Sequence, residues 1–332
     1  MAIHWITFLL TASGIVLAGT KLAVYGEALG KRSGIGQGWI GLLFLATITS
    51  IPELTTTVSG ASLGAPIIAV GNALGSNLFN IAIIVVIDIL LLKRGPFLQK
   101  VHSYHAVSGG IAILLTALVI LGILLAPGWS LLGISPISVL ILVVYIAGVF
   151  VLYHIEKQEA DNDEADPPGM SLARAVTGFA VCAVVIVASG FFLIRASKAI
   201  SIGTGLSASF VGAVLVAIVT SLPELSTSIG AMRIGAYDMI VGNLLGSNMF
   251  NILTVFAADV AFRNGTIFAG LGTEAVEQLI VAVLGIGLTV IAIIAIGVRS
   301  RRRVLGMGID AALILVVYLA STAIIVSRGI GL

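Results

Sequence analysis

The chain has 332 residues, of which 59% are hydrophobic and 10% are charged, and its formal net charge is +2. Its mean hydropathy of +1.18 lies far outside the range of soluble domains, and so small a charge, spread over many loops, argues against nucleic-acid binding. The single cysteine, Cys182, lies in an apolar stretch, which excludes a disulfide framework or a cysteine metal site within one chain. We therefore predict an all-α polytopic membrane protein.

Apolar stretches recur along the whole sequence, each close to the length of about 20 residues that a membrane-spanning helix needs. They predict ten transmembrane helices. In chain order, these helices are expected at residues 3–25, 37–60, 66–92, 106–126, 134–155, 173–194, 208–230, 238–262, 277–298 and 308–327.

The basic residues predict the orientation of these helices. If the N-terminus is external, the inner loops carry twelve of the 17 Lys and Arg residues, and cytoplasmic loops are the ones that retain positive charge. With ten spans, the C-terminus is then external as well. The chain shows no targeting segment, so we expect a prokaryotic plasma membrane.

The sequence contains one motif pair twice. Residues 49–80 and 220–251 align without a gap, and 17 of the 32 positions are identical, including Pro, Glu, Asn, Ser and Gly. Five predicted helices separate equivalent positions, and this odd number turns the second copy upside down in the membrane. The pattern predicts two inverted five-helix repeats, an architecture of secondary transporters. The first repeat covers 1–155 and the second 173–332, with an acidic cytoplasmic linker at 156–172.

Each copy of the first motif, TSxPEL, places a glutamate in the interior of an apolar span, at Glu53 and Glu224. An intramembrane charge costs at least about 2.5 kcal/mol and marks a functional site by default. The preceding prolines remove a backbone donor and free carbonyl groups upstream, which can face an ion. Further oxygens at this depth are expected from the carbonyl stretches that begin at Ala46 and Ala217 and from the hydroxyls of Thr49, Ser50, Thr220 and Ser221.

The second motif, GNxLGSNxFN, adds neutral oxygens. Ser76 and Asn80 are four residues apart and share a helix face, as do Ser247 and Asn251. Carboxylate, carbonyl and hydroxyl oxygens suit hard cations, and neither motif contains a histidine, so the pattern favours a site for a divalent ion balanced by two carboxylates. The alternative is that the serines and asparagines form only interhelical hydrogen bonds. Small-xxx-small steps at Gly71 with Gly75 and at Gly242 with Gly246 predict close helix packing.

Two aspartates, Asp88 and Asp259, also respect the repeat, but they lie near predicted helix ends. We expect a structural role for both, with Asp259 pairing with Arg263 and Asp88 with Lys93 or Arg94. The histidines His4, His102, His105 and His154 fall near membrane edges or in the third loop, so they are expected to be interfacial or solvated.

At TSIPEL with GNALGSNLFN, and at TSLPEL with GNLLGSNMFN, the chain resembles the α-repeats of the Ca²⁺/cation antiporter superfamily, and most closely its Na⁺/Ca²⁺ exchanger branch. The resemblance implies alternating access, with the first and sixth helices sliding over a core that holds the ions. It implies that Glu53 and Glu224 bind Ca²⁺ and share in Na⁺ binding. It implies further ligands at Thr49, Thr220, Ser50, Ser221, Ser76 and Ser247 and at the carbonyls of Ala46 and Ala217. The chain departs from the pattern at Asn80 and Asn251, because some relatives carry Asp there in one repeat.

The leading hypothesis is an antiporter that exchanges Na⁺ for Ca²⁺, without a cofactor and within the lipid bilayer. Proton-coupled relatives typically carry an additional acid in the second motif, which this chain lacks in both copies. A proton-coupled exchanger of Ca²⁺, Mg²⁺ or Mn²⁺ is the alternative. A cation channel would require a continuous pore, and an enzyme would not explain symmetrically duplicated carboxylates. The sequence leaves the oligomeric state open.

Overall fold

The computed structural model describes residues 2–33, 36–92, 95–126, 130, 133–160, 169–204, 219–272 and 275–327, and these are helical apart from loops and one short hairpin. The helices are α1 (Ala2–Ser33), α2 (Gln37–Trp39), the π-helix η1 (Ile40–Leu45), α3 (Ala46–Thr49), α4 (Ile51–Ser62), α5 (Pro66–Leu90), the 3₁₀ helix η2 (Phe97–Lys100), α6 (His105–Leu125), α7 (Pro136–Ala160), α8 (Leu172–Thr204), α10 (Leu222–Ile234), α11 (Tyr237–Ala261), α12 (Ile267–Gly270), α13 (Ala275–Val298) and α14 (Ile309–Ser327). Strands β1 (Arg303–Val304) and β2 (Met307–Gly308) pair antiparallel.

The prediction of a polytopic helical membrane protein is confirmed. Within the described ranges, seven helices are long and apolar enough to cross a membrane, or up to eight if the bent pair Gln37–Thr49 and Ile51–Ser62 forms one span. α14 contains a shorter apolar stretch, Ile309–Ile325. The span expected at 208–230 is described only from residue 219 onward, so its first part, with Ala217, lies outside the described residues.

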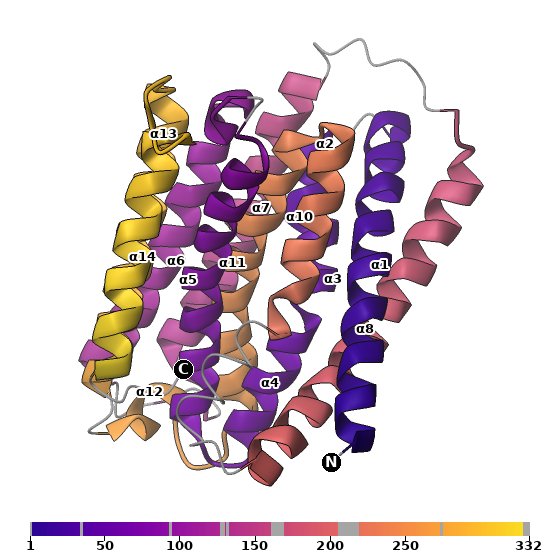
Figure 1. Ribbon diagram of the computed structural model, residues 1–332. Helices are drawn as coiled ribbons and strands as arrows, with labels where there is room; N and C mark the ends of the chain where they lie inside the picture. The colour runs from indigo at the N-terminus through magenta and orange to yellow at the C-terminus, as the bar shows by residue number, and fades with distance from the viewer. Residues whose placement is uncertain are drawn as a thin grey trace.

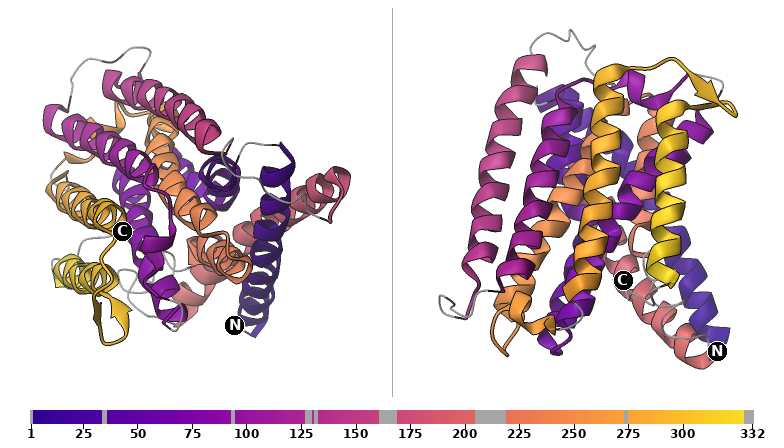
Figure 2. Two further views of the ribbon diagram at one scale, coloured as in Figure 1. Left: turned by 90° about the horizontal axis from the view of Figure 1, so that it is seen from above. Right: turned by 90° about the vertical axis from the view of Figure 1, so that its left-hand side faces the viewer.

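The helices form a bundle whose centre is α5 and α11 (Figures 1 and 2). In the 18-residue apolar stretch of each helix, 72% of the residues of α5 and 83% of those of α11 are buried. The corresponding shares are 17% for α1 and 28% for α8. α1 and α8 pack on each other along one edge of the bundle, and α13 and α14 lie at the opposite edge (Figure 1). The two central helices carry the second motif, so the repeated polar residues lie inside the protein.

The outer helices present large apolar side chains away from the protein. Leu10 and Leu17 on α1 are 68% and 67% exposed, and Val184 on α8 is 68% exposed. On a soluble protein so many exposed aliphatic residues would be unfavourable, whereas lipid tails are as apolar as leucine. These faces are therefore the lipid-facing surface of the bundle.

Glycines bring the π-helix η1 into backbone contact with α11. A Cβ atom added at Gly246 would overlap the carbonyl oxygen of Leu42, and one added at Gly242 would overlap a carbonyl of α2. The small-xxx-small step predicted at Gly242 and Gly246 is thus confirmed as a close helix contact. The equivalent step at Gly71 and Gly75 stays a prediction.

The carboxylates of Asp88 and Asp259 bind the backbone of connecting segments at the ends of the central helices. Both are buried, with exposed fractions of 3% and 1%, and each carboxylate accepts two backbone N–H groups. The donors are Phe97 and Gly308 for Asp88, at 2.7 and 2.8 Å, and Ser135 and Ile267 for Asp259, at 2.7 and 2.5 Å. The structural role holds, but in the described chain the partners are backbone amides and not Arg263; Lys93 and Arg94 lie outside the described residues. Two charge-assisted hydrogen bonds let a carboxylate stay buried near a helix end.

One histidine differs from expectation. His105 is fully buried, and its Nε2 lies 3.1 Å from Oδ1 of Asp238. His102 is half exposed and places its Nδ1 2.8 Å from Oδ2 of the same carboxylate. The prediction that all histidines are solvated or interfacial is wrong for His105, because the segment before α6 folds over the first turn of α11 and closes its ring off from solvent.

Candidate functional site

Both copies of the first motif interrupt a helix at the serine. Ser50 has φ −91° and ψ 9° and separates α3 from α4, whose parent segments are bent by 46°. Ser221 has nearly the same conformation, with φ −90° and ψ 7°, immediately before α10. The proline two residues later has no N–H and fits the first turn of a new helix. Glu53 and Glu224 therefore lie in the first turns of short helices, where backbone N–H groups face an anion.

The two glutamates are buried without a countercharge. Their exposed fractions are 1% for Glu53 and 0% for Glu224, and the carboxylates are close enough to interact electrostatically. In the described part of the chain, the ion pairs involve Glu27 and Asp238, and neither site glutamate contacts a Lys or Arg. Two such charges at this depth are costly unless a cation lies between them.

Hydroxyl groups of each copy face the glutamate of the other copy. Ser50 donates to Oε1 of Glu224 at 3.0 Å, and Thr220 and Ser221 face the carboxylate of Glu53. Within the second copy, Ser247 also donates to Oε1 of Glu224, at 3.4 Å. The structure thus brings together residues that are about 170 positions apart, as the repeat predicts.

Thr49 extends this hydroxyl shell. Its Oγ1 lies 3.5 Å from Oγ of Ser247 and 3.4 Å from Oδ1 of Asn243. Ser76 is buried on α5, at the position equivalent to Ser247. The carbonyl oxygen of Ala46 accepts the Ser50 N–H at 3.0 Å and the Thr49 hydroxyl at 3.4 Å. Its part in ion binding stays a prediction, as does that of Ala217.

Four asparagines form a reciprocal network between α5 and α11. Asn77 donates to the backbone carbonyl of Asn248 at 3.1 Å, and Asn248 donates to that of Asn77 at 3.4 Å. A backbone carbonyl can only accept, so these two bonds fix which way each amide is turned. The side-chain oxygen of Asn248 then accepts from Asn80 at 3.0 Å, and that of Asn77 accepts from Asn251 at 3.1 Å. The remaining oxygens, Oδ1 of Asn80 and of Asn251, are turned away from the network.

The buried site atoms that lack a hydrogen-bond partner among the described residues are all oxygens. They are both carboxylate oxygens of Glu53, Oε2 of Glu224, Oγ of Ser221, and Oδ1 of Asn80 and of Asn251. Buried polar groups normally have partners, so a set of unpaired acceptors indicates a bound cation. Oxygen ligands that include two carboxylates suit a hard cation such as Ca²⁺ or Na⁺. Over the same ranges, no group of three or more His, Cys, Asp or Glu residues forms a metal cluster.

Two asparagines of the second motif support the broken helices, a role that sequence reasoning missed. Asn72 donates to the carbonyl of Glu53 at 3.2 Å and to the hydroxyl of Thr57 at 2.9 Å. Asn243 donates to the hydroxyl of Thr227 at 3.1 Å. The available signal was the run of threonines and serines just after each glutamate on the same short helix, and its members Thr57 and Thr227, which accept from the asparagines, are buried.

A GxSxG pattern, which serine hydrolases use at their nucleophile, occurs at residues 60–64. Its serine, Ser62, is exposed at the end of α4 and donates to the carbonyl of Val58 at 2.8 Å. It lies on a helix and not on a strand-to-helix turn, so the pattern lacks the structural context of a hydrolase site.

Comparison with known proteins places this geometry in a family. The family described as "Sodium/calcium exchanger protein" matches the chain twice, over residues 3–154 and 174–327. The chain belongs to the sodium/calcium exchanger family. Its members are membrane antiporters, in agreement with the resemblance seen at the two motif pairs.

Relatives cover most of this exchanger-family chain. It is 28% identical over 276 residues to the putative antiporter CaxA of Alkalimonas amylolytica, covering 79% of this chain and 84% of the relative. It is 24% identical over 268 residues to the sodium/calcium exchanger MaX1 of Methanosarcina acetivorans, covering 71% and 76%. A structure of the sodium-calcium exchanger NCX_Mj superimposes with a TM-score of 0.72 at 21% identity, covering 97% of this chain and 98% of that one. The structural match supports the fold.

Proposed function

We propose that this protein exchanges Na⁺ for Ca²⁺ across a membrane by alternating access, with ten transmembrane helices arranged as two inverted five-helix repeats. The observation that carries the proposal is the set of unpartnered buried oxygens contributed by both copies of the motif pair. The reciprocal bonds between Asn77 and Asn248, 171 positions apart, support a pseudo-symmetric relation between the copies. The name of the relative MaX1, a sodium/calcium exchanger, supports the choice of ions.

The charge of the site explains why exchange would be coupled. Glu53 and Glu224 neutralise one divalent cation, and the other ligands of the described site are neutral. If Ca²⁺ leaves without replacement, two carboxylates remain buried and repel each other, which is strongly unfavourable. Entry of Na⁺ lowers that penalty, so the departure of Ca²⁺ is coupled to the binding of Na⁺. The proposed ligands are Glu53, Glu224, Thr49, Thr220, Ser50, Ser221, Ser76, Ser247, Asn80, Asn251, and the carbonyls of Ala46 and Ala217.

The proposed topology places both termini outside the cell and the 156–172 linker in the cytoplasm. In Figure 1, α1 begins and α14 ends at one end of the bundle, whereas α7 ends and α8 begins at the other. This arrangement agrees with the distribution of Lys and Arg between the loops. A prokaryotic plasma membrane is supported by the relative YrbG, an inner membrane protein of Escherichia coli that is 27% identical over 278 residues.

The proposal is tested by Ca²⁺ uptake into proteoliposomes that are preloaded with Na⁺. Outward Na⁺ should drive uptake by the wild-type protein, and Glu53→Gln or Glu224→Gln should abolish it, because each substitution keeps the shape and removes one of the two site charges. Glu277→Gln is the matched control. It removes a carboxylate from the first turn of α13, outside the site, and should leave uptake unchanged.

Other outcomes point to the alternatives. Uptake that responds only to a pH gradient would replace the Na⁺-coupled proposal by a proton-coupled divalent exchanger. Flux that needs no counter-ion would indicate a channel. If Ca²⁺ fails to move under either gradient, the substrate assignment is wrong, while membership of the family is unaffected.

A further inference from the structure

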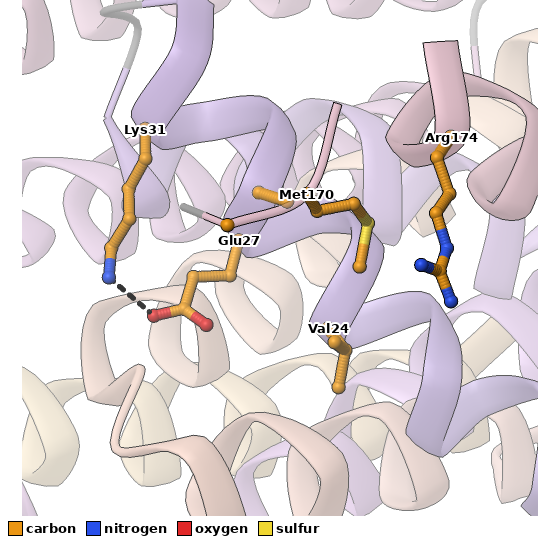
Figure 3. A pocket seen from close by; sticks show the side chains of 7 residues that line it. Val24, Glu27, Lys31, Met170 and Arg174 are labelled. Atoms are coloured by element: carbon orange, nitrogen blue, oxygen red, sulfur yellow. Dashed lines mark ion pairs between the residues drawn. The ribbon is translucent and has the colours of Figure 1, made fainter. Parts of the chain in front are cut away.

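A pocket outside the ion site lies where the second half of α1 meets the start of α8. It encloses about 330 Å³ and is lined by residues of α1, including Val24, Glu27 and Lys31, and by Met170 and Arg174 near the start of α8. Figure 3 shows Lys31 and Arg174 at opposite sides of the pocket, with Glu27 and Met170 between them. The pocket is therefore lined by both of the helices, α1 and α8, that lie along one edge of the bundle.

The charged groups of this pocket are two basic side chains and one acidic side chain. Lys31 pairs with Glu27 at 3.1 Å, which leaves further N–H donors on its ammonium group. The guanidinium of Arg174 makes no hydrogen bond or ion pair to any residue that the structure describes. Arg32 donates to the carbonyl of Met170 at 2.7 Å and holds this segment beside the pocket. The lining side chains carry a net charge of +1, and the guanidinium of Arg174 has no partner among the residues that the structure describes.

The pocket lies at the boundary of the apolar spans. The span formed by α1 extends over Ala2–Arg32, and the span formed by α8 begins at Leu172. On the membrane side of the basic groups, Val176, which follows Arg174 on α8, is 51% exposed, and the lining residue Val24 on α1 is 37% exposed. Basic side chains above exposed aliphatic ones match the level at which lipid headgroups meet acyl chains.

We propose that this pocket binds the phosphate of an anionic phospholipid. The guanidinium of Arg174 can bind two phosphate oxygens in a fork, and Lys31 supplies a second positive charge from α1. A headgroup with one negative charge neutralises the +1 of the lining, which a zwitterionic lipid does not. The exposed aliphatic residues below accommodate the acyl chains. A free phosphate has the same charge chemistry but lacks those chains.

A lipid bound here ties the end of α1 to the start of α8. In the proposed exchange mechanism these two helices move together over the core, so the lipid would stabilise the pair and move with it; this consequence rests on the proposed function. The binding itself does not, and it is measured without ion flux.

The test compares binding of phosphatidylglycerol to the purified full-length chain in detergent, by the shift in melting temperature and by native mass spectrometry. Phosphatidylglycerol should bind wild type and raise its Tm, and Arg174→Gln should weaken binding about fivefold, which corresponds to about 1 kcal/mol for one basic contact. Arg233→Gln is the matched control, since it removes an exposed arginine from α10 and should bind as wild type does.

Several results would overturn the proposal. Equal binding by wild type and Arg174→Gln would show that the pocket is not the site, and equal losses in Arg174→Gln and Arg233→Gln would show unspecific surface attraction. A response to phosphatidylcholine, phosphatidylethanolamine or inorganic phosphate as large as that to phosphatidylglycerol would reject an anionic lipid. If Arg174→Gln does not fold, Lys31→Gln tests the same pocket from α1. Lipid binding without any ion exchange would reject the proposed function and leave this site standing.

Discussion

Four asparagines occupy the middle of the site without adding charge. Asn77 and Asn248 are fixed by backbone carbonyls, and they in turn fix Asn80 and Asn251, whose remaining oxygens are buried and unpartnered. An aspartate at position 80 or 251 would place an oxygen against an oxygen of this network, because the amide nitrogen that donates there would be gone. The network therefore fits neutral side chains, and the charge of the site stays at −2.

This network gives a prediction at the scale of one residue. In Asn248→Ala, Asn80 loses the acceptor that orients its amide, and its Oδ1 is no longer held in position. One lost hydrogen bond corresponds to roughly 0.5–1.5 kcal/mol, so the KM for Ca²⁺ should rise about two- to tenfold, with a smaller change in maximal rate. Ca²⁺ uptake in proteoliposomes measures both quantities.

The control for this prediction is Thr55→Val, which removes a hydroxyl on the exposed side of α4 that bonds only its own helix, at 2.9 Å to Ile51. It should leave the KM unchanged. A purely structural role for Asn248 would lower the Tm and the maximal rate while the KM for Ca²⁺ stays constant, and that outcome would contradict the assigned positioning role.

At the scale of elements, the approach of η1 to α11 depends on the absence of side chains at Gly242 and Gly246. Both lie under backbone atoms of the broken span, whose far end carries Thr49 and Ser50. Any atom added between the two helices moves this span as a unit, because the facing atoms are backbone and cannot change rotamer.

Gly246→Ala should therefore impair transport although it replaces none of the proposed ligands. Its Cβ would overlap the carbonyl of Leu42, and overpacking of this kind costs about 1–3 kcal/mol. We expect a lower Tm and Ca²⁺ uptake reduced at least tenfold. Gly287→Ala on α13 is the matched control, because a Cβ there meets nothing within 4 Å. Its transport and Tm should equal or slightly exceed those of wild type. Equal behaviour of the two variants would show that the close contact is dispensable.

Sequence patterns predicted some of these elements and not others. Apolar length predicted the helices that are long enough to span a membrane, and Pro52 and Pro223 predicted irregular backbone just upstream of each proline, because a missing N–H acts locally. The π-helix η1 was not predicted, since nothing in its apolar run distinguishes it from an α-helix.

The hydrogen-bond partners of buried polar groups could not be predicted from the sequence either, because they lie far away along the chain. The amide donors of Asp88 and Asp259 come from loops as far as 220 and 124 positions away, and the burial of His105 depends on Asp238 of another helix. In contrast, the proximity of Glu224 to hydroxyl groups of both motif copies follows from the sequence, because the internal repeat is itself long-range information.

At the scale of the whole molecule, α1 and α8 form a pair that rests on the core through small residues. Between α1 and α10, Gly19 faces Ser226, and Gly230 faces the backbone of Thr20. Because the side chains between these helices are small, they do not interdigitate, and one helix can shift along the other without repacking of side chains. The family resemblance implies that this pair slides as a unit during transport.

Disulfide cross-links can distinguish two kinds of movement: displacement of the α1–α8 pair relative to the core, and displacement of α1 relative to α8. A disulfide requires a Cβ–Cβ distance of about 3.5–4.5 Å. A Cβ built at Gly14 lies 3.9 Å from Cβ of Ser189 on α8 and fits this range, whereas one built at Gly19 lies 3.0 Å from Cβ of Ser226 on α10, so α1 must move slightly away from α10 for that bond to form. In a Cys182→Ala background, Gly19→Cys with Ser226→Cys should abolish Ca²⁺ uptake when oxidised and recover it on reduction, because the link holds α1 to the core.

The same background with Gly14→Cys and Ser189→Cys is the control, since its link joins two helices that are expected to move together. Its oxidised form should transport at a rate close to that of its reduced form. Inhibition by both links would mean that α1 and α8 move relative to each other. Full activity of the oxidised Gly19–Ser226 link would mean that access to Glu53 and Glu224 changes without displacement of α1 from α10, and sliding would then have to be replaced by local gating.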